Sequence, residues 1–395
     1  MLAVSLRQIG MAANACRFGR RLLQTQAGSA SDWQLQTAIA FDIDGVLVKG
    51  KRTLDQGRRA LAMLNGDNRL NKKIPFVLMT NGGGVSEATK AADISKRLQT
   101  EIRADQVVLA HSPMQSLVKQ YGDKHVLVVG GIKRRCADIA RAYGFTDVST
   151  PNDLVHWQPS LWPFMRPPAN DQLSAVPGRD YAMHPFHAVM VFYDSFDFGR
   201  DLQVVTDVLR SKDATAGNDF VDRQVVPLFM SNEDLVFSND YSQPRFGQGA
   251  YHVCLRAMWH ALTNGAPLEY TRFGKPHQVQ YRYSEQLLDR MAMAAVPGID
   301  LASMRAGRCI YAIGDNPAAD IAGANGAGWS SVLVRTGVFR GPPGSNDAAN
   351  PATMVVDHVE DAVSWILETE AKRLDAVGSG LKTKIKARAG SPLCA

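Results

Sequence analysis

Four short polar segments of the sequence carry side chains that can attack, protonate or bind a reacting group. In the first segment, Asp42 and Asp44 stand two residues apart, and Gly45 lets the chain turn sharply so that both carboxylates can face one substrate. Paired carboxylates suit nucleophilic and acid–base catalysis, and their oxygens are the ligands that hard divalent cations prefer. The other segments contain, in chain order, Thr80 and Asn81, then Lys275, then Asp315, Asn316 and Asp320.

Three of these segments directly follow short apolar runs that predict buried strands. The runs are Thr37–Phe41, Phe76–Met79 and Cys309–Ile313. Residues 54–65 and 86–99, which follow the first two runs, have helical character. Strands that alternate with helices predict a parallel, doubly wound sheet, and ligands bind such a sheet at its carboxyl edge. The polar segments are therefore expected at one edge of one sheet.

The middle of the chain has a second alternation of strands and helices. Its predicted strands are 126–129, 188–193 and 225–230, and its predicted helices are 133–142, 200–211 and 248–262. The proline-rich stretch 151–187 is expected to be irregular. The first pattern then returns, with helices at 276–293 and 359–374 and a strand at 331–334.

This organisation predicts an α/β fold with an inserted domain. We expect a doubly wound, parallel, Rossmann-like core made of residues 33–104 and 266–376. An α/β cap domain of residues 105–265 would interrupt it, and residues 377–395 would form a basic flexible tail.

Composition excludes several classes of protein. The 395 residues are 45% hydrophobic and 21% charged, and no run approaches the ~18 apolar residues of a membrane-spanning helix. Eight of the 44 basic residues lie in two acid-free ends, 1–31 and the tail from 382, which leaves 36 against 38 acidic residues. The body is thus nearly neutral, so nucleic acid is not the expected partner. The five cysteines include no C-x-x-C pair and fit reduced thiols rather than a zinc site.

The N-terminal segment, residues 1–32, has the composition of a mitochondrial transit peptide. Arginine and serine are present, and the first acidic residue is Asp32. A secretory signal would need a compact apolar stretch, which Arg7, Asn14 and Arg17 interrupt. A location in the mitochondrial matrix is therefore expected, although a basic extension without a targeting role also fits this composition.

The four segments together resemble the motifs of the haloacid dehalogenase superfamily of phosphohydrolases. They begin at Asp42, Thr80, Lys275 and Gly314, and the motif residues Asp42, Thr80, Lys275 and Asp315 are separated by 38, 195 and 40 residues. The long middle interval resembles that of subclass IIA, which inserts a large α/β cap there. The stretch Tyr311–Phe339 is similar to the branch named after a cat eye syndrome critical region protein, many of whose members are mitochondrial.

This resemblance implies a catalytic role for five residues. Asp42 would be the nucleophile that forms an aspartyl-phosphate, and Asp44 would be the general acid and then the general base. The Thr80 hydroxyl and the Asn81 backbone N–H would hold phosphoryl oxygens. Lys275 would supply a fixed positive charge to the nucleophile and the transferring group.

The resemblance also implies a Mg²⁺ site. Asp42, the backbone carbonyl of Asp44, and Asp315 would hold the ion. Asp320 and Asn316 would lie outside the metal ligands, where Asp320 would orient waters or Lys275. In the cap, Asn232 and Asp234 stand where relatives reach towards the substrate, and they are candidates for specificity, although a polar turn explains them equally well.

Each segment on its own also has a purely structural explanation. Asp-x-Asp-Gly is a common turn, Thr80-Asn81 can open a loop, Lys275 can be a solvated lysine, and Asp315 can cap a helix. Two further motifs, His184-x-x-His187 and Val129-Gly130-Gly131, lack the partners of a metal or phosphate site.

The order of the four segments and their placement at one sheet edge favour an enzyme. The expected activity is a Mg²⁺-dependent phosphatase acting on a small phosphorylated metabolite. The alternative that stays open is a catalytically quiet scaffold on the same fold, which would bind a protein partner.

Overall fold

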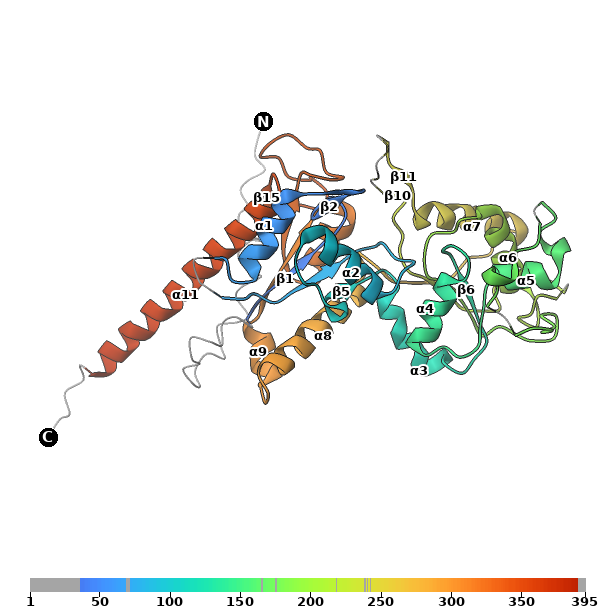
Figure 1. Ribbon diagram of the computed structural model, residues 1–395, viewed down its shortest axis with the longest axis horizontal. Coiled ribbons are helices and arrows are strands. Elements are labelled where there is room, and N and C mark those ends of the chain that lie inside the picture. The colour runs from blue at the N-terminus through green and yellow to red at the C-terminus, as the bar shows by residue number, and fades with distance from the viewer. Residues whose placement is uncertain are drawn as a thin grey trace, which may run out of the picture.

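The computed structural model describes residues 36–389 except 69–71, 165, 175, 218, 238, 240 and 242, with side chains to residue 376. The segment predicted to be a transit peptide, residues 1–32, lies outside the described residues. The chain forms a core domain and a cap domain that lie side by side (Figure 1). Among the described residues, no helix is both long enough and apolar enough to cross a membrane.

The core domain contains a six-stranded parallel sheet in the order β15-β14-β13-β1-β4-β5. Its strands are β1 (Thr37–Phe41), β4 (Phe76–Met79), β5 (Val107–Val108), β13 (Cys309–Gly314), β14 (Ser330–Val334) and β15 (Met354–Val356). The central strand β1 pairs with β13 over five residues, from Thr37 opposite Cys309 to Phe41 opposite Ile313. Segments 272 residues apart in the sequence therefore end at the same sheet edge.

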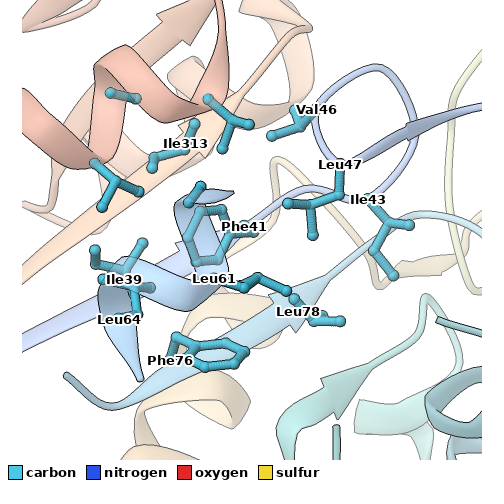
Figure 2. Close-up of a cluster of buried hydrophobic side chains, with 14 of the residues drawn as sticks. Ile39, Phe41, Ile43, Val46, Leu47, Leu61, Leu64, Phe76, Leu78 and Ile313 are labelled. Atoms are coloured by element: carbon cyan, nitrogen blue, oxygen red, sulfur yellow. The ribbon is translucent and has the colours of Figure 1, made fainter. Parts of the chain in front are cut away.

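Both faces of this sheet are covered, which explains the continuous apolar runs. Ile39 and Phe41 pack under α1 and α11, and Figure 2 shows them beside Leu61 and Leu64 of α1. Ala38 and Ala40 alternate onto the other face, in the cluster that includes residues of α8 and α10. The core helices are α1 (Asp55–Leu64), α2 (Glu87–Leu98), α8 (Gln278–Ala295), α9 (Leu301–Gly307), α10 (Ala322–Gly326) and α11 (Val359–Ala389), with the π-helix η7 (Pro317–Ile321) and the 3₁₀ turn η3 (Ala104–Gln106).

The cap domain contains a five-stranded parallel sheet in the order β12-β9-β8-β6-β7. Its strands are β6 (Val126–Val129), β7 (Val148–Ser149), β8 (Ala188–Val191), β9 (Leu228–Met230) and β12 (Thr271–Arg272). Its helices are α3 (Val118–Tyr121), α4 (Arg135–Tyr143), α5 (Pro151–Trp157), α6 (Phe198–Arg210) and α7 (Gln248–Leu262). Its 3₁₀ turns are η4 (Ser112–Leu117), η5 (Pro159–Leu161) and η6 (Asn170–Gln172). Helices on both faces confirm the predicted α/β class.

Two antiparallel hairpins project from these domains. The first, β2 (Val48–Lys49) with β3 (Arg52–Thr53), follows the predicted catalytic turn after β1. The second, β10 (Val236–Phe237) with β11 (Arg245–Phe246), lies between β9 and α7 of the cap.

The structure moves two predicted boundaries. Residues 107–108, placed in the cap by the sequence pattern, form β5 and pair with β4 of the core. Residues 271–272, placed in the core, form β12 and pair with β9 of the cap. Strands of two residues are too short to show an apolar period, so their sheet is decided by tertiary pairing.

Two segments expected to be irregular contain helix. The closing helix α11 continues to Ala389, well beyond residue 374, and includes most of the segment predicted to be a flexible tail. Lys, Leu, Ala and Arg are good helix formers, and two glycines in this stretch do not end the helix. In the proline-rich stretch, Pro151 occupies the first turn of α5, where its missing N–H costs nothing.

Candidate active site

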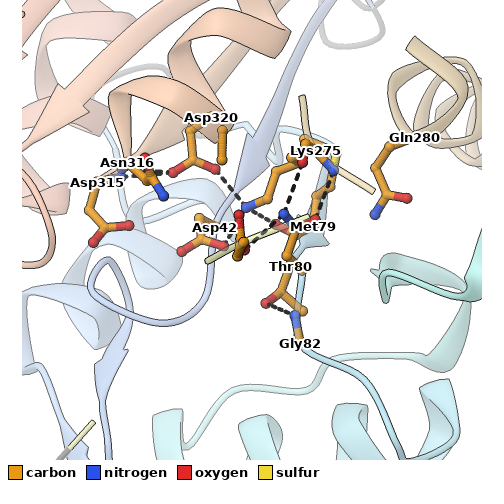
Figure 3. Close-up of polar contacts among 12 residues, drawn as sticks. Asp42, Met79, Thr80, Gly82, Lys275, Gln280, Asp315, Asn316 and Asp320 are labelled. Atoms are coloured by element: carbon orange, nitrogen blue, oxygen red, sulfur yellow. Dashed lines mark hydrogen bonds and ion pairs between the residues drawn. The ribbon is translucent and has the colours of Figure 1, made fainter. Parts of the chain in front are cut away.

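The carboxyl ends of β1, β4 and β13 bring the predicted site residues together. Asp42, Thr80 and Asp315 each directly follow one of these strands, and all three are buried. The backbone N–H of Asp42 donates to the carbonyl of Ile313 at 2.8 Å, which fixes the end of β1 beside the end of β13. Figure 3 shows these side chains converging on one region of the sheet edge.

Lys275 lies at the centre of this group (Figure 3). Its ammonium nitrogen Nζ lies 2.6 Å from Oδ1 of Asp42, 2.6 Å from Oδ1 of Asp320 and 3.1 Å from the carbonyl oxygen of Met79. The side chain is only 3% exposed. Burial by itself would lower the pKa of Lys275, but the two carboxylates outweigh it and raise this pKa well above its ordinary value. Lys275 is therefore a permanent cation in this site.

Asp320 holds Lys275 in position. Its Oδ1 accepts from Lys275, and its Oδ2 accepts from the backbone N–H groups of Asp315 and Asn316 at 3.1 and 3.0 Å. Both carboxylate oxygens are thus occupied by donors, which leaves Asp320 poorly placed to bind a metal directly. The Asn316 side chain caps η7 by accepting from the N–H of Ala318, so its only direct link to the site is its backbone N–H.

Backbone groups of three other residues lie close to the Asp315 carboxylate. Its Oδ2 accepts from the N–H of Val338 at 2.5 Å. A Cβ atom on Gly337 would lie 1.8 Å from that oxygen, and one on Gly45 would lie 2.4 Å from it. Burial, followed by the nearby charge of Asp320, raises the pKa of Asp315 to about 7.

The buried carboxylates fit a divalent cation. Ligand atoms of Asp42, Asp315 and Asp320 lie within 4.8 Å of one another. When all three are ionised, Lys275 balances only one charge and the buried group carries a net charge of −2. Burial also raises the pKa of Asp42 well above its ordinary value, despite the opposing effect of Lys275. A hard, oxygen-preferring ion such as Mg²⁺ would neutralise this excess, with Asp42 and Asp315 as its side-chain ligands.

Asp44 differs from Asp42 in its surroundings. It is exposed, and Gly45 next to it adopts a positive φ of 89° that turns the chain away from the direction of the strand. The turn is closed by a hydrogen bond of 2.6 Å from the N–H of Gly45 to the carbonyl of Val48. Asp44 is therefore open to solvent, two residues from the buried Asp42.

Thr80 and Asn81 begin the loop after β4. Thr80 Oγ1 accepts from the N–H of Gly82 at 3.0 Å, which shapes the loop. The Asn81 side chain has a role that the sequence did not indicate. Its Oδ1 accepts from the backbone N–H of Lys275 at 2.7 Å, and its Nδ2 donates to the carbonyl of Lys275 at 3.0 Å. Asn81 therefore positions the backbone of the central lysine.

The two cap candidates lie against this loop. Asn232 Nδ2 donates to the carbonyl of Asn81 at 3.0 Å, and Asp234 Oδ2 accepts from Asn81 Nδ2 at 2.9 Å. Asp234 is half-buried, and its burial raises its pKa. Asn232 and Asp234 thus place one loop of the cap directly over the sheet edge that carries Asp42.

Sequence reasoning missed several residues of this junction. Glu233, between the two cap candidates, accepts from His277 Nε2 at 2.9 Å and from the Tyr270 hydroxyl at 3.2 Å. The ring of Tyr193, from the cap, packs so closely on the loop after Thr80 that a Cβ on Gly84 would lie 2.4 Å from it. The run of three glycines at 82–84 was the available signal, because closely approached backbone favours glycine.

Comparisons with known proteins agree with this fold. A family model described as haloacid dehalogenase-like hydrolase matches residues 39–146, and a second, described as HAD-hydrolase-like, matches residues 272–362. A mitochondrial hydrolase of Saccharomyces cerevisiae is 33% identical over 371 residues, which cover 89% of this chain and 99% of that protein. The chain belongs to the haloacid dehalogenase-like hydrolases. Its cap is inserted between the second and third motifs, as in subclass IIA.

Two further proteins extend the comparison. A fusion protein of Schizosaccharomyces pombe, named cardiolipin synthase (CMP-forming) / mitochondrial hydrolase, is 37% identical over 333 residues. The match covers 83% of this chain and 53% of that protein, so the chain spans about half the length of this relative. The crystal structure of a glycerol phosphate phosphatase from Mycobacterium tuberculosis in complex with magnesium has a similar fold. The TM-score is 0.51 at 18% identity, with 82% of this chain and 75% of that chain covered.

Proposed function

We propose that this protein is a Mg²⁺-dependent phosphatase that cleaves phosphoric monoesters through an aspartyl-phosphate on Asp42. The observation that carries the proposal is the buried contact of 2.6 Å between Lys275 and Asp42 at the sheet edge. The ammonium of Lys275 favours the ionised form of this buried carboxylate, against the burial that raises its pKa, and an ionised carboxylate is a nucleophile.

The chain's own residues supply most of this chemistry. Asp42 attacks phosphorus while the ester oxygen leaves with a proton from Asp44, and Asp44 then takes a proton from the water that hydrolyses the aspartyl-phosphate. The Thr80 hydroxyl and the Asn81 N–H bind phosphoryl oxygens, and Lys275 stabilises their negative charge. Mg²⁺, when held by Asp42, the Asp44 carbonyl and Asp315, supplies the charge that lets a phosphate dianion approach these carboxylates.

The cap favours a substrate whose phosphate reaches a covered site. Asn232 and Asp234 contact Asn81 from above, so a large folded protein could not reach Asp42 without displacement of the cap. A small phosphorylated metabolite is therefore our first candidate for the substrate.

A second candidate is a phosphorylated membrane lipid. It is favoured by one observation, the relative in which a hydrolase similar to this chain is fused to a cardiolipin synthase. Cardiolipin is a phospholipid, so the fusion suggests a lipid that carries a phosphate ester.

For location, we propose the mitochondrion, and within it the matrix. The names of both relatives and the acid-free start of the sequence support this proposal.

Hydrolysis of p-nitrophenyl phosphate tests the activity. We expect turnover with Mg²⁺, loss of turnover with EDTA, and a fall of at least ~10³-fold in Asp42→Asn. Beryllium fluoride with Mg²⁺ should raise the melting temperature of the wild type but not of Asp42→Asn. Turnover that is absent, or unchanged by EDTA and by Asp42→Asn, would overturn the proposal in favour of a scaffold.

A further inference from the structure

The hairpin formed by β10 and β11 exposes an unusual amount of apolar surface. Leu235, Val236, Phe237 and Phe246 are 54%, 38%, 39% and 75% exposed, and the ring of Tyr241 is 62% exposed. Val236 and Phe246 pair on one face of the ribbon, which is apolar, and Phe237 pairs with Arg245 on the other face, which is mixed. A group of neighbouring exposed apolar side chains marks a surface that contacts a partner or a membrane, and the face of Val236 and Phe246 is such a surface.

The hairpin is joined directly to the active site. Its first residue, Leu235, follows Asp234, whose carboxylate accepts from Asn81 at 2.9 Å. Phe237 is three residues from Asp234, a chain distance of at most ~10 Å. The base is anchored by bonds from the N–H of Gly247 to Leu235 at 3.0 Å and from that of Gly249 to Asp234 at 2.9 Å. The apolar surface therefore begins beside the place where the substrate's phosphate would bind.

The hairpin also carries a cation, and the core adds apolar surface beside the site. The guanidinium of Arg245 lies 4.5 Å from the centre of the Tyr241 ring, and Arg245 is exposed. On the core side, Val338, whose N–H binds Asp315, has a side chain that is 45% exposed. Aromatic residues together with arginine are typical of protein segments that lie at the surface of a bilayer.

We propose that the exposed apolar side chains of β10 and β11 dock on the surface of an anionic bilayer and that the substrate is a phosphomonoester lipid presented by that bilayer. The phosphate of the lipid reaches Asp42, while its apolar part stays beside Phe237 and Phe246. This inference rests on the proposed phosphatase function and names the second substrate candidate as the physiological class. The lipid's phosphate ester bond is the bond that breaks, and water supplies the oxygen of the released phosphate.

Vesicle flotation tests the docking step without turnover. The Asp42→Asn protein is mixed with phosphatidylcholine vesicles with or without about 20 mol% dioleoyl phosphatidic acid, and the double variant Phe237→Ser/Phe246→Ser is compared in the same background. Both replaced side chains are exposed, so folding should persist. We expect binding to the phosphatidic acid vesicles, with the bound fraction at least ~5-fold lower in the double variant. The matched control is Phe164→Ser, an 80% exposed cap residue outside the hairpin, which should bind normally.

Turnover in an active background tests the substrate class. The ratio of kcat/KM for vesicle-borne phosphatidic acid to kcat/KM for glycerol 3-phosphate should fall at least ~10-fold in Phe237→Ser/Phe246→Ser and stay unchanged in Phe164→Ser. Arg245→Glu should lower the same ratio, and less so at high salt.

Three outcomes would overturn the inference. They are equal binding to both kinds of vesicle, an unchanged ratio in the hairpin variant, and a dimer that the hairpin variant converts to a monomer with no change in vesicle binding. The last would mark the hairpin as an interface between two copies. Failure of the phosphatase itself is seen separately, because p-nitrophenyl phosphate turnover does not require a bilayer and flotation does not require turnover.

Discussion

Lys275 and Asp320 lie 45 residues apart in the sequence, yet their Nζ and Oδ1 atoms are 2.6 Å apart in a buried site. The same Nζ atom is 2.6 Å from Asp42, so the lysine is held between two carboxylates rather than paired with one. Backbone N–H groups at the start of η7 fix the other oxygen of Asp320. This chain of contacts sets the distance between the lysine and the proposed nucleophile.

Removal of the central lysine should be costly to both stability and activity. Lys275→Met leaves two buried carboxylates without their cation, and breaking a buried ion pair in this way costs about 3–5 kcal/mol. We expect kcat/KM for p-nitrophenyl phosphate to fall by about 10³-fold or more. Asp320→Asn should destabilise the protein less, because Lys275 keeps Asp42 as its partner. Melting curves and steady-state kinetics measure both effects, and a wild-type melting temperature in Lys275→Met would contradict this reading.

The contribution of Asp315 to the stability of the metal-free protein should fall as the pH rises from about 4 to 7. The pKa of Asp315 is about 7 in the folded protein, compared with the ordinary value of 3.8 in an unfolded chain. Between these two pH values, the folded state therefore binds more protons than the unfolded state. The contribution of Asp315 therefore favours folding at low pH and is lost as the carboxyl ionises, by about 1 kcal/mol per pH unit.

Urea titrations in EDTA at several pH values check this expectation. The wild type is compared with Asp315→Asn, and the difference in unfolding free energy isolates the one carboxyl. Because Asn cannot ionise, the variant should gain stability relative to the wild type as the pH rises. A difference that does not change with pH would show that Asp315 does not carry this effect.

Mg²⁺ should stabilise the fold through Asp42 and Asp315. An ion that binds only the folded state raises the melting temperature, and at ~100 times its dissociation constant the gain is about 2.7 kcal/mol. Protons compete for the same carboxylates, so the shift should be larger at pH 8 than at pH 6. Asp315→Asn should abolish the shift, whereas Asp55→Asn, at an exposed position in α1, should keep it. Equal shifts in both variants would place the ion elsewhere.

Gly337 should be intolerant of a side chain. A Cβ at this position would lie 1.8 Å from Oδ2 of Asp315, so Gly337→Ala must displace the carboxylate that we propose as a metal ligand. We expect at least a ~10-fold loss of kcat/KM and a weaker response to Mg²⁺. Gly307→Ala is the matched control, because its Cβ would meet only ordinary contacts at 3.5 Å. Comparable losses in both variants would show that the effect does not come from displacement of the Asp315 carboxylate.

Much of the fold could be predicted because the core strands are buried on both faces. The predicted runs Thr37–Phe41 and Phe76–Met79 match β1 and β4 residue for residue. A strand covered on both sides is apolar throughout, and the polar residue that follows it marks the sheet edge. The positions of Asp42 and Thr80 were predictable for this reason.

The division between core and cap was less predictable. β5 and β12 have two residues each, and only their pairing with β4 and β9 assigns them to a sheet. The roles of Asn81 and Glu233 at the junction are also invisible in the sequence, because their partners lie more than 35 residues away. No local pattern encodes such a contact.

The sequence by itself determined the order of the chemical groups and the class of sheet that carries them, since both follow from residue type and apolar spacing along the chain. Only the tertiary structure decided that Asp320 holds Lys275, that Asp315 sits against the backbone of Gly337, and that an apolar hairpin adjoins the site. These relationships depend on how distant segments pack, and packing distances are set by the whole fold rather than by any one segment.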